Sequence, residues 1–253
     1  DTAKAPRGNG RGTVVVAAAA SIDGTFRNAL VECATGFDTA CKVYAQLIGN
    51  VQTDALSNKK YWYFLRLMGN GPSHINVECA LQTNPNVTII GEEVAARRMT
   101  LASITTELSD VIAARAADGK NYGVVLLPEG LIEAVPEVRA LIEELNALFH
   151  SAEHGDAFQQ GTASAQVQAV SALLTPWARA LFDFLPPFIR EQMVVDRQAD
   201  GNVNLTVIET DRLLRHLVEA ELAKRKAAGA YAGKFSAITS FFGYQARCSM
   251  PSN

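Results

Sequence analysis

The feature that most constrains this chain is the alternation of short, mostly apolar runs with stretches of helical periodicity. Apolar runs occur at residues 13–20, 61–68, 87–90, 124–127 and 235–242. Such runs, without polar alternation, are typical of strands buried on both faces. Helical patterns separate them at residues 38–50, 73–82, 100–117 and 131–149. Strand–helix–strand alternation predicts an α/β fold with a parallel, Rossmann-like sheet and right-handed crossovers.

The alternation stops between residues 151 and 233, where the sequence has no convincing strand pattern. Residues 163–185 and 209–228 have helical periodicity instead. The second stretch begins with Thr206-x-x-Glu209, the spacing of a capping box, and ends with basic residues that suit a helix C-terminus. We therefore predict a helical insertion on the sheet domain over residues 151–233.

Charge and composition exclude several classes of protein. The net charge of −3 gives no basic footprint for nucleic acid or an anionic membrane. No apolar run approaches the roughly 20 residues that a membrane-spanning helix needs. The four cysteines have no CxxC spacing and no histidine at ligand spacing, which argues against a metal site and favours a reducing compartment.

The first residues suggest where the chain works in the cell. Residues 1–12 are rich in Gly, Lys and Arg and predict a flexible lead-in without a secretory signal. We therefore expect a cytoplasmic location. An organellar location stays open, because a transit peptide could have been removed upstream.

Polar or charged groups follow four of the predicted strands, on turns that contain glycine. They are Asp23, the turn at residues 68–73 (MGNGPS), Glu129 and Arg247. Each has an ordinary alternative, as a turn residue, loop punctuation, a neighbour of a helix N-terminus or a surface charge. Parallel strands end at one edge of a sheet, however, and Pro72 after two glycines predicts free N–H groups at a helix start. Together the four turns predict one crevice for an anionic ligand.

Six segments, in order, carry a resemblance to a known family. They are residues 36–42 (GFDTACK), 78–86 (ECALQTNPN), 91–94 (GEEV), 128–133 (PEGLIE), 185–189 (LPPFI) and 241–247 (FFGYQAR). From about residue 12 onward the chain resembles the pyrophosphate-dependent phosphofructokinases of the long, plant and protist type. The resemblance implies the phosphofructokinase fold and a glycolytic reaction. In it, magnesium-dependent phosphoryl transfer links pyrophosphate to the 1-hydroxyl of fructose 6-phosphate.

The resemblance also implies roles for individual residues. Asp23 resembles the base that accepts the sugar hydroxyl proton, and Ser21 and Ile22 belong to the same turn. Glu129 resembles the carboxylate that binds sugar hydroxyls. Lys60 and Tyr61 resemble a pair that reaches into a partner subunit's site. The sugar-phosphate motif and clamp correspond to Met68, Gly69, Asn70, Tyr244, Gln245, Ala246 and Arg247. A base at the hydroxyl with cations and N–H donors around the phosphate is what this chemistry needs.

Three positions depart from the family pattern, and each loses a charge. Ala20 stands where the family has Lys, Thr25 replaces an Asp linked to magnesium, and Asn70 replaces an Arg. Losing one preorganised donor typically costs about 2.7–4 kcal/mol at the transition state. The resemblance also starts midway along the family's length, without the Gly-Gly-Asp-Asp donor segment. We therefore assign no metal ligand to the chain.

These departures leave three hypotheses about function. The favoured one is a degenerate, non-catalytic structural or regulatory subunit in a homo- or hetero-oligomer with phosphofructokinase-type or other subunits, able to bind fructose phosphates. The alternative is a fragment of an active pyrophosphate-dependent phosphofructokinase. A third is a bare sugar-phosphate sensor. The expected division is a lead-in (1–12), a remnant of the donor-side domain (13–35), a sugar-phosphate domain (36–150), the helical insertion (151–233) and a return strand with the C-terminal segment (234–253).

Overall fold

The centre of the molecule is a four-stranded parallel sheet with the strand order β4-β5-β3-β6. This computed structural model describes residues 20–22, 24–25, 29–32, 34–69, 71–151 and 162–246. The strands are β3 (Trp62–Leu67), β4 (Val87–Thr88), β5 (Gly123–Pro128) and β6 (Ala237–Phe242). Every residue of β3 and β5 is buried, as expected for central strands covered on both faces. The prediction of a parallel α/β sheet is confirmed.

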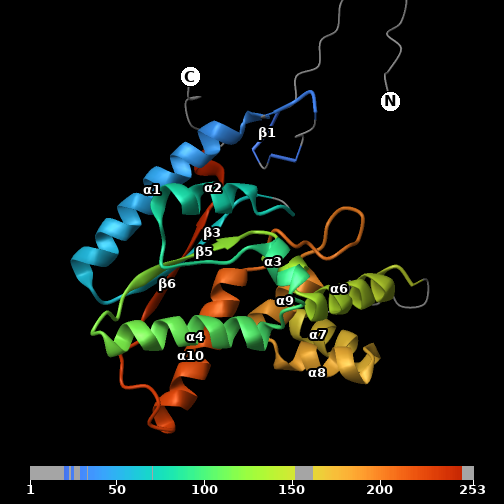
Figure 1. The fold of residues 1–253 in the computed structure, drawn as a ribbon. Coiled ribbons are helices and arrows are strands. Elements are labelled where there is room, and N and C mark those ends of the chain that lie inside the picture. Colours follow the sequence, from blue (N-terminus) through green and yellow to red (C-terminus); the bar gives the residue numbers. More distant parts are fainter. Residues whose placement is uncertain are drawn as a thin grey trace, which may run out of the picture.

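Helices cover both faces of this sheet (Figure 1). On one face α1 (Phe37–Asn58) and α2 (His74–Thr83) pack on β3 and β5. On the other, α10 (Thr210–Ala227) packs on β3 and β6 and against α4 (Leu101–Ala117). Side chains alternate along β3, so Trp62 and Phe64 join the core under α4 and α10, whereas Tyr63, Leu65 and Leu67 join the core under α1 and α2.

A helical lobe lies beside the sheet and contains α6 (Pro136–Phe149), α7 (Ala163–Leu173), α8 (Pro176–Phe184) and α9 (Pro187–Val195). Within described residues 162–233 there is no strand, only an isolated antiparallel bridge between Arg197 and Val203, so the predicted lack of strands holds for this part of the chain. The bounds of the insertion stay a prediction. Its buried side chains are continuous with the core under α4 and α10.

Prolines divide this lobe more finely than the sequence periodicity indicated. The helix expected at 131–149 is α5 (Leu131–Ala134) followed by α6, and the helix expected at 163–185 is α7 followed by α8. Pro136, Pro176 and Pro187 each occupy the first turn of a new helix. Proline cannot donate an N–H inside a helix and disfavours a helical residue before it, so both continuous helices were wrong predictions.

The predicted capping box before α10 is also wrong. Glu209 is the N-cap residue of α10, but its side chain makes no cap hydrogen bond, and the Thr206 hydroxyl donates to Asn204 Oδ1 at 2.8 Å. A capping box does form at α4, where Thr100 and Ser103 exchange hydrogen bonds. The basic residues in the last turn of α10 are present as predicted.

Two short strands lie outside the main sheet. β1 (Ala20–Ser21) pairs in parallel with β2 (Thr35–Gly36). Of the strand expected at 13–20, only Ala20 belongs to the described residues. Contrary to the prediction, Ala20 is not part of the main sheet. The short helix α3 (Gly91–Ala96) follows β4 and was not predicted. In the described part of the chain, no helix combines the length and the apolar character needed to cross a membrane.

Candidate functional site

The carboxyl ends of β3, β5 and β6 are tied together by hydrogen bonds at one edge of the sheet. The Gly69 N–H donates to Glu129 Oε2 at 3.0 Å, and the Glu129 N–H donates to Leu67 O at 3.1 Å. The Met68 N–H donates to Phe242 O at 2.9 Å. The structure therefore brings Met68, Gly69, Glu129 and the turn after β6 together, because parallel strands end at the same edge.

Glu129 is a buried carboxylate at this edge, with only 7% of its surface exposed. Burying a charged carboxylate is costly unless it accepts hydrogen bonds, and the Gly69 N–H supplies one. That bond also holds the turn after β3 in place. One Glu129 oxygen thus accepts a structural hydrogen bond, which uses only one of the acceptor positions of the carboxylate.

The turn after β6 is held from two sides. The Tyr44 hydroxyl on α1 donates to Gly243 O at 2.6 Å, and the Gly243 N–H donates to Gln245 Oε1 at 2.7 Å. The 3₁₀ turn η2 (Tyr244–Ala246) follows, with Ala246 packed in the core under α1 and α2. The Tyr244 side chain is 65% exposed. Gln245 and Ala246 therefore shape the turn, and Tyr244 is the side chain presented to solvent.

The loop before α2 is occupied by a carboxylate of the chain itself. The Ser73 N–H donates to Glu92 Oε1 at 2.9 Å, and the Gly91 N–H donates to Ser73 Oγ at 2.9 Å. Burial by itself would raise the pKa of Glu92, but hydrogen bonds from Ser73 and the Glu92 backbone outweigh it, so this pKa is lowered. The Ser73 N–H that the sequence suggested as a phosphate donor is therefore bonded to Glu92.

A cavity of about 460 Å³ lies beside this loop. Its wall is formed by three segments of the chain, with the residues Gly24, Glu32, Ala34, Phe37, Ser73, His74, Val77, Glu78, Ile90 and Glu92. Gly24 has a φ of +72°, and a Cβ there would lie 3.2 Å from His74 Nδ1. Among these described lining residues there are three carboxylates and no Lys or Arg, so the charge does not match the predicted anionic crevice.

The other predicted residues are dispersed. Ser21 belongs to β1, and Ile22 packs against the core under α1 and α2. Lys60 and Tyr61 precede the amino end of β3, whereas Gly69 follows its carboxyl end. Asp23, Asn70 and Arg247 lie outside the described residues. Among the residues that are described, no three His, Cys, Asp or Glu side chains are placed to hold a metal ion.

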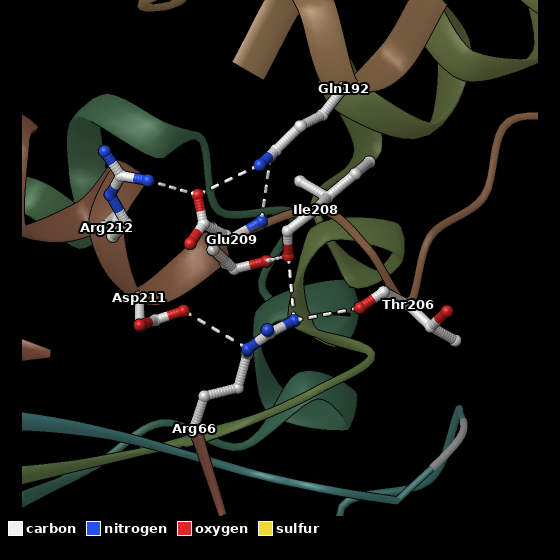
Figure 2. Close-up of polar contacts among 8 residues, drawn as sticks. Arg66, Gln192, Thr206, Ile208, Glu209, Asp211 and Arg212 are labelled. Carbon is white, nitrogen blue, oxygen red and sulfur yellow. Dashed lines mark hydrogen bonds and ion pairs between the residues drawn. The ribbon is translucent and has the colours of Figure 1, made fainter. Parts of the chain in front are cut away.

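The sequence reasoning missed a buried ion pair beside the site (Figure 2). Arg66 Nε lies 3.2 Å from Asp211 Oδ1, and Arg66 NH1 donates to Ile208 O at 2.8 Å and to Thr206 O at 3.3 Å. The guanidinium lies 4.2 Å from the centre of the Phe241 ring. Burial raises the pKa of Asp211, and the Arg66 charge offsets part of that rise. The signal in the sequence was one arginine inside the apolar run 61–68.

The same figure shows a second group of contacts at the start of α10. Glu209 Oε2 accepts hydrogen bonds from Gln192 Nε2 at 2.9 Å and from Arg212 NH1 at 2.5 Å. The Glu209 N–H donates to Gln192 Oε1 at 3.1 Å. These contacts join α9 to α10, while Arg66 joins the same loop to β3. The carboxyl edge of the sheet is thereby fastened to the helical lobe.

Comparisons with known proteins agree with this architecture. The family model described as phosphofructokinase matches residues 6–174, well over half of the chain. The chain is 50% identical to "Pyrophosphate--fructose 6-phosphate 1-phosphotransferase subunit alpha" of Solanum tuberosum, over 95% of this chain and 37% of that protein. It is 47% identical to the subunit beta of the same plant, over 95% of this chain and 41% of that protein.

A bacterial relative is similar to the same degree. The "Pyrophosphate--fructose 6-phosphate 1-phosphotransferase" of Treponema pallidum is 48% identical, over 97% of this chain and 43% of that protein. The chain thus spans less than half the length of these relatives. The resemblance to pyrophosphate-dependent members is confirmed, and the chain belongs to the phosphofructokinase family.

Proposed function

We propose that this chain is a pyrophosphate-type phosphofructokinase subunit that holds fructose 6-phosphate at the carboxyl edge of its sheet but does not catalyse phosphoryl transfer by itself. One observation carries the proposal. The chain is about half identical to subunits of this transferase, yet the described wall of its cavity contains carboxylates and no Lys or Arg. Phosphoryl transfer depends on neutralising phosphate charge, and the described part of this wall supplies no Lys or Arg for it.

The sugar side of the proposed site uses the groups at the strand ends. The Glu129 carboxylate, which also accepts the Gly69 N–H, would accept a hydrogen bond from a sugar hydroxyl. The exposed Tyr244 side chain would lie next to the phosphate. By the family resemblance, Arg247 would supply the cation and Asp23 would accept the hydroxyl proton. A carboxylate positioned at a hydroxyl is the standard arrangement for general-base catalysis.

Charges that the family pattern places around the phosphate groups, including the one at the position of Asn70 in the sugar-phosphate motif, are missing from this chain. Ala20, Thr25 and Asn70 replace a Lys, an Asp and an Arg of the family pattern. Glu92 moreover occupies the Ser73 N–H that could have faced a phosphate. Two lost cations together cost roughly 10⁴ in rate or more, although such losses are not additive. Magnesium belongs to the proposal only through the family resemblance, and no step proposed here passes through it.

Assembly is the second part of the proposal. Plant relatives carry the names subunit alpha and subunit beta. We propose that this chain likewise works in a homo- or hetero-oligomer of phosphofructokinase-type subunits. Lys60 and Tyr61, at the edge of the sheet opposite the site, are the residues that would reach a neighbouring subunit.

The experiment has two arms on the full chain. Calorimetric titration with fructose 6-phosphate should show weak binding, and Glu129→Gln should weaken it about tenfold because a hydrogen bond to a charged group is lost. Glu143→Gln, an exposed glutamate on α6, is the matched control and should bind as the parent does. No binding by the parent, or equal binding by both variants, would contradict the sugar site.

The second arm measures formation of fructose 1,6-bisphosphate in a coupled assay with pyrophosphate and magnesium. We expect no turnover from this chain, and none from the triple variant Ala20→Lys, Thr25→Asp, Asn70→Arg. Turnover of about 1 s⁻¹ or more from the parent chain, typical of working enzymes, would overturn the non-catalytic part of the proposal.

A second candidate function is favoured by the similarity to the Treponema pallidum protein, whose name carries no subunit designation. In that case the chain is a segment of an active pyrophosphate-dependent phosphofructokinase. The discriminating measurement adds a separately expressed segment that contains the Gly-Gly-Asp-Asp donor motif. Activity that appears only in the mixture would favour this candidate, and activity absent from the mixture would favour the non-catalytic subunit.

A further inference from the structure

Helix α8 lies at the lower side of the helical lobe in the view of Figure 1. It packs on α6 and α7, and its inner face buries Ala178 and Phe182 completely. On its outer face Trp177 is 52% exposed and Phe184 is 58% exposed, and Leu173 at the end of the neighbouring helix α7 is exposed too. Two exposed aromatic side chains about two helical turns apart form an apolar stripe of the kind that marks an interaction site.

The outer face of α8 has a regular arrangement. At 100° per residue, Ala180 lies at the centre of the exposed face, opposite Ala178 and Phe182. Trp177 and Phe184 lie along one side of this centre line, and Arg179 and Asp183 lie along the other. The aromatic pair is centred between positions 180 and 181 of the helix, and the charged pair is centred on position 181.

We propose that α8 is a self-association surface, on which two copies of this chain pair with their α8 helices antiparallel about a two-fold axis. Under this two-fold axis, a residue at one end of α8 lies opposite the residue at the other end of the partner's α8. Residues on one side of the centre line face residues on that same side in the partner. Trp177 then faces the partner's Phe184, and Arg179 faces the partner's Asp183. Ala180, the small residue at the crossing point, lets the two helices approach closely.

The symmetry of the charges favours a second copy over another partner. A two-fold contact must be complementary to itself, and here both an aromatic pair and an opposite-charge pair are centred on nearly the same point. A stripe of one charge sign would instead have indicated a partner of the opposite sign. Both charged side chains are also held by the lobe. Arg179 donates to the Ser171 and Ala172 carbonyls, and Asp183 lies 3.5 Å from Arg190. Ordered side chains lose less entropy on binding.

The size of the stripe sets the expected strength. A stable specific interface buries about 800 Å² on each partner, and one nine-residue helix with a neighbouring leucine offers less than that. The contact is therefore expected to be a weak dimer, formed in the micromolar range. It concerns assembly and does not depend on whether the chain catalyses a reaction.

Sedimentation velocity of the full chain over about 1–200 µM is the first test, since this range brackets a micromolar dissociation constant. Trp177→Gln and Phe184→Gln should each weaken the dimer at least about tenfold, because buried aromatic residues dominate interface energies and each substitution occurs twice in a symmetric dimer. Leu81→Gln, at a leucine of α2 that is 72% exposed, is the matched control and should leave association unchanged. Circular dichroism confirms that the variants are folded.

Cross-linking tests the axis itself. In a background with Cys33 and Cys248 changed to Ser, Ala180→Cys places one thiol at the two-fold axis, while Cys41 and Cys79 stay buried. Oxidised glutathione should then convert two thiols to one intermolecular disulfide, with two reduced glutathione molecules released. Ala102→Cys, on the exposed side of α4, is the control and should cross-link only at background level.

Three results would overturn the proposal. The first is a chain that stays monomeric at every concentration. The second is Ala180→Cys cross-linking no better than Ala102→Cys. The third is a chain that stays monomeric alone but binds a different phosphofructokinase-type subunit through α8, which would assign the surface to a hetero-oligomer.

Discussion

The two faces of the sheet differ in what covers them and in what they do for the site. Under α1 and α2 lies a small core, from which Tyr44 reaches the turn after β6 and beside which His74 lines the cavity. Under α4 and α10 lies a larger core that continues into the helical lobe and includes the aliphatic surroundings of the buried Arg66–Asp211 pair. Successive side chains of β3 point to opposite faces of the sheet, so this one strand contributes side chains to both cores.

The difference separates two tasks. The α4/α10 face joins the sheet to the lobe, so a substitution there should change the free energy of global unfolding. The α1/α2 face positions the turns of the candidate site, so a substitution there should mainly change the local opening of these turns. Stability that is unevenly distributed in this way is common in proteins, and local opening costs less than global unfolding.

The largest effect should come from breaking the buried ion pair. Arg66→Ala leaves Asp211 buried without its partner and removes the guanidinium donor from the Thr206 and Ile208 carbonyls, so we expect a loss of about 3–5 kcal/mol in unfolding free energy. Chemical denaturation measures it. The double variant Arg66→Met, Asp211→Leu should recover much of the loss because no charge is left buried.

An exposed arginine provides the control for this change. Arg97 pairs with Glu93 and Glu107 on the surface, and Arg97→Ala should change stability little. Equal losses for Arg66→Ala and Arg97→Ala would show that the pair does not fasten the sheet to the lobe.

Gly24→Ala should act locally on the α1/α2 side. The residue has a φ of +72°, and its Cβ would lie 3.2 Å from His74 Nδ1 and 3.3 Å from the Phe37 ring. Left-handed backbone costs an alanine about 1–2 kcal/mol, and the close contacts add to this. Hydrogen exchange should speed up at β1 and β2 but not at β3.

Gly119→Ala is the matched variant, since Gly119 has a φ of +77° and no atom within 4 Å of its added Cβ. It carries the same backbone strain without the contacts, so β1 and β2 should stay protected. If both variants loosen β1 and β2 alike, the contact with His74 is not what holds that segment.

Two tyrosines compare the faces directly. Tyr44→Phe removes the donor to Gly243 O, so stability should fall by about 0.5–1.5 kcal/mol and the turn at Gly243 should exchange faster. Tyr231 lies in the α4/α10 core, and its hydroxyl is buried with no hydrogen-bond partner among the described residues. Tyr231→Phe should therefore be neutral or stabilising. Denaturation midpoints of the two variants that move together would contradict this assignment.

The smallest effect should be seen in the acid limb of stability. The pKa of Glu92 in the folded chain is below its ordinary value of 4.5. Its contribution is therefore present above the unfolded pKa and is lost as the pH falls through the lower, folded pKa. Glu92→Gln should flatten the fall in stability below about pH 4.5 in denaturation curves. An acid limb as steep as that of the parent would show that the Ser73 hydrogen bond is not the cause.

The pKa of Asp211 is shifted in the opposite direction to that of Glu92, so its effect on stability has the opposite pH dependence. Because burial raises its pKa in the folded chain, its contribution is full below its ordinary value of 3.8 and is lost as the pH rises through the folded pKa. Acid therefore acts in opposite directions on the two carboxylates: it removes the stability that the Ser73–Glu92 contact contributes, whereas it relieves the cost of burying the charged Asp211 side chain.

Much of the fold could be predicted from the sequence, for identifiable reasons. β3 and β5 are continuous apolar runs, and α4 carries an apolar stripe at helical spacing. The breaks at Pro136 and Pro176 were missed because the apolar periodicity continues across them. At the site, Gly69 and Glu129 could be found because they follow predicted strands. The Ser73–Glu92 contact could not, since it joins two loops that no local pattern connects.

The sequence by itself determined the parallel α/β class, the helical lobe and the strand ends that carry Gly69 and Glu129, because these follow from local periodicity and from where parallel strands must end. Only the tertiary structure decided that Glu92 occupies the Ser73 N–H, that Arg66 and Asp211 meet, and that Trp177 and Phe184 face solvent together. Those facts depend on distances between elements far apart in the chain. Such distances are set by how all the cores pack at once, and no single segment encodes them.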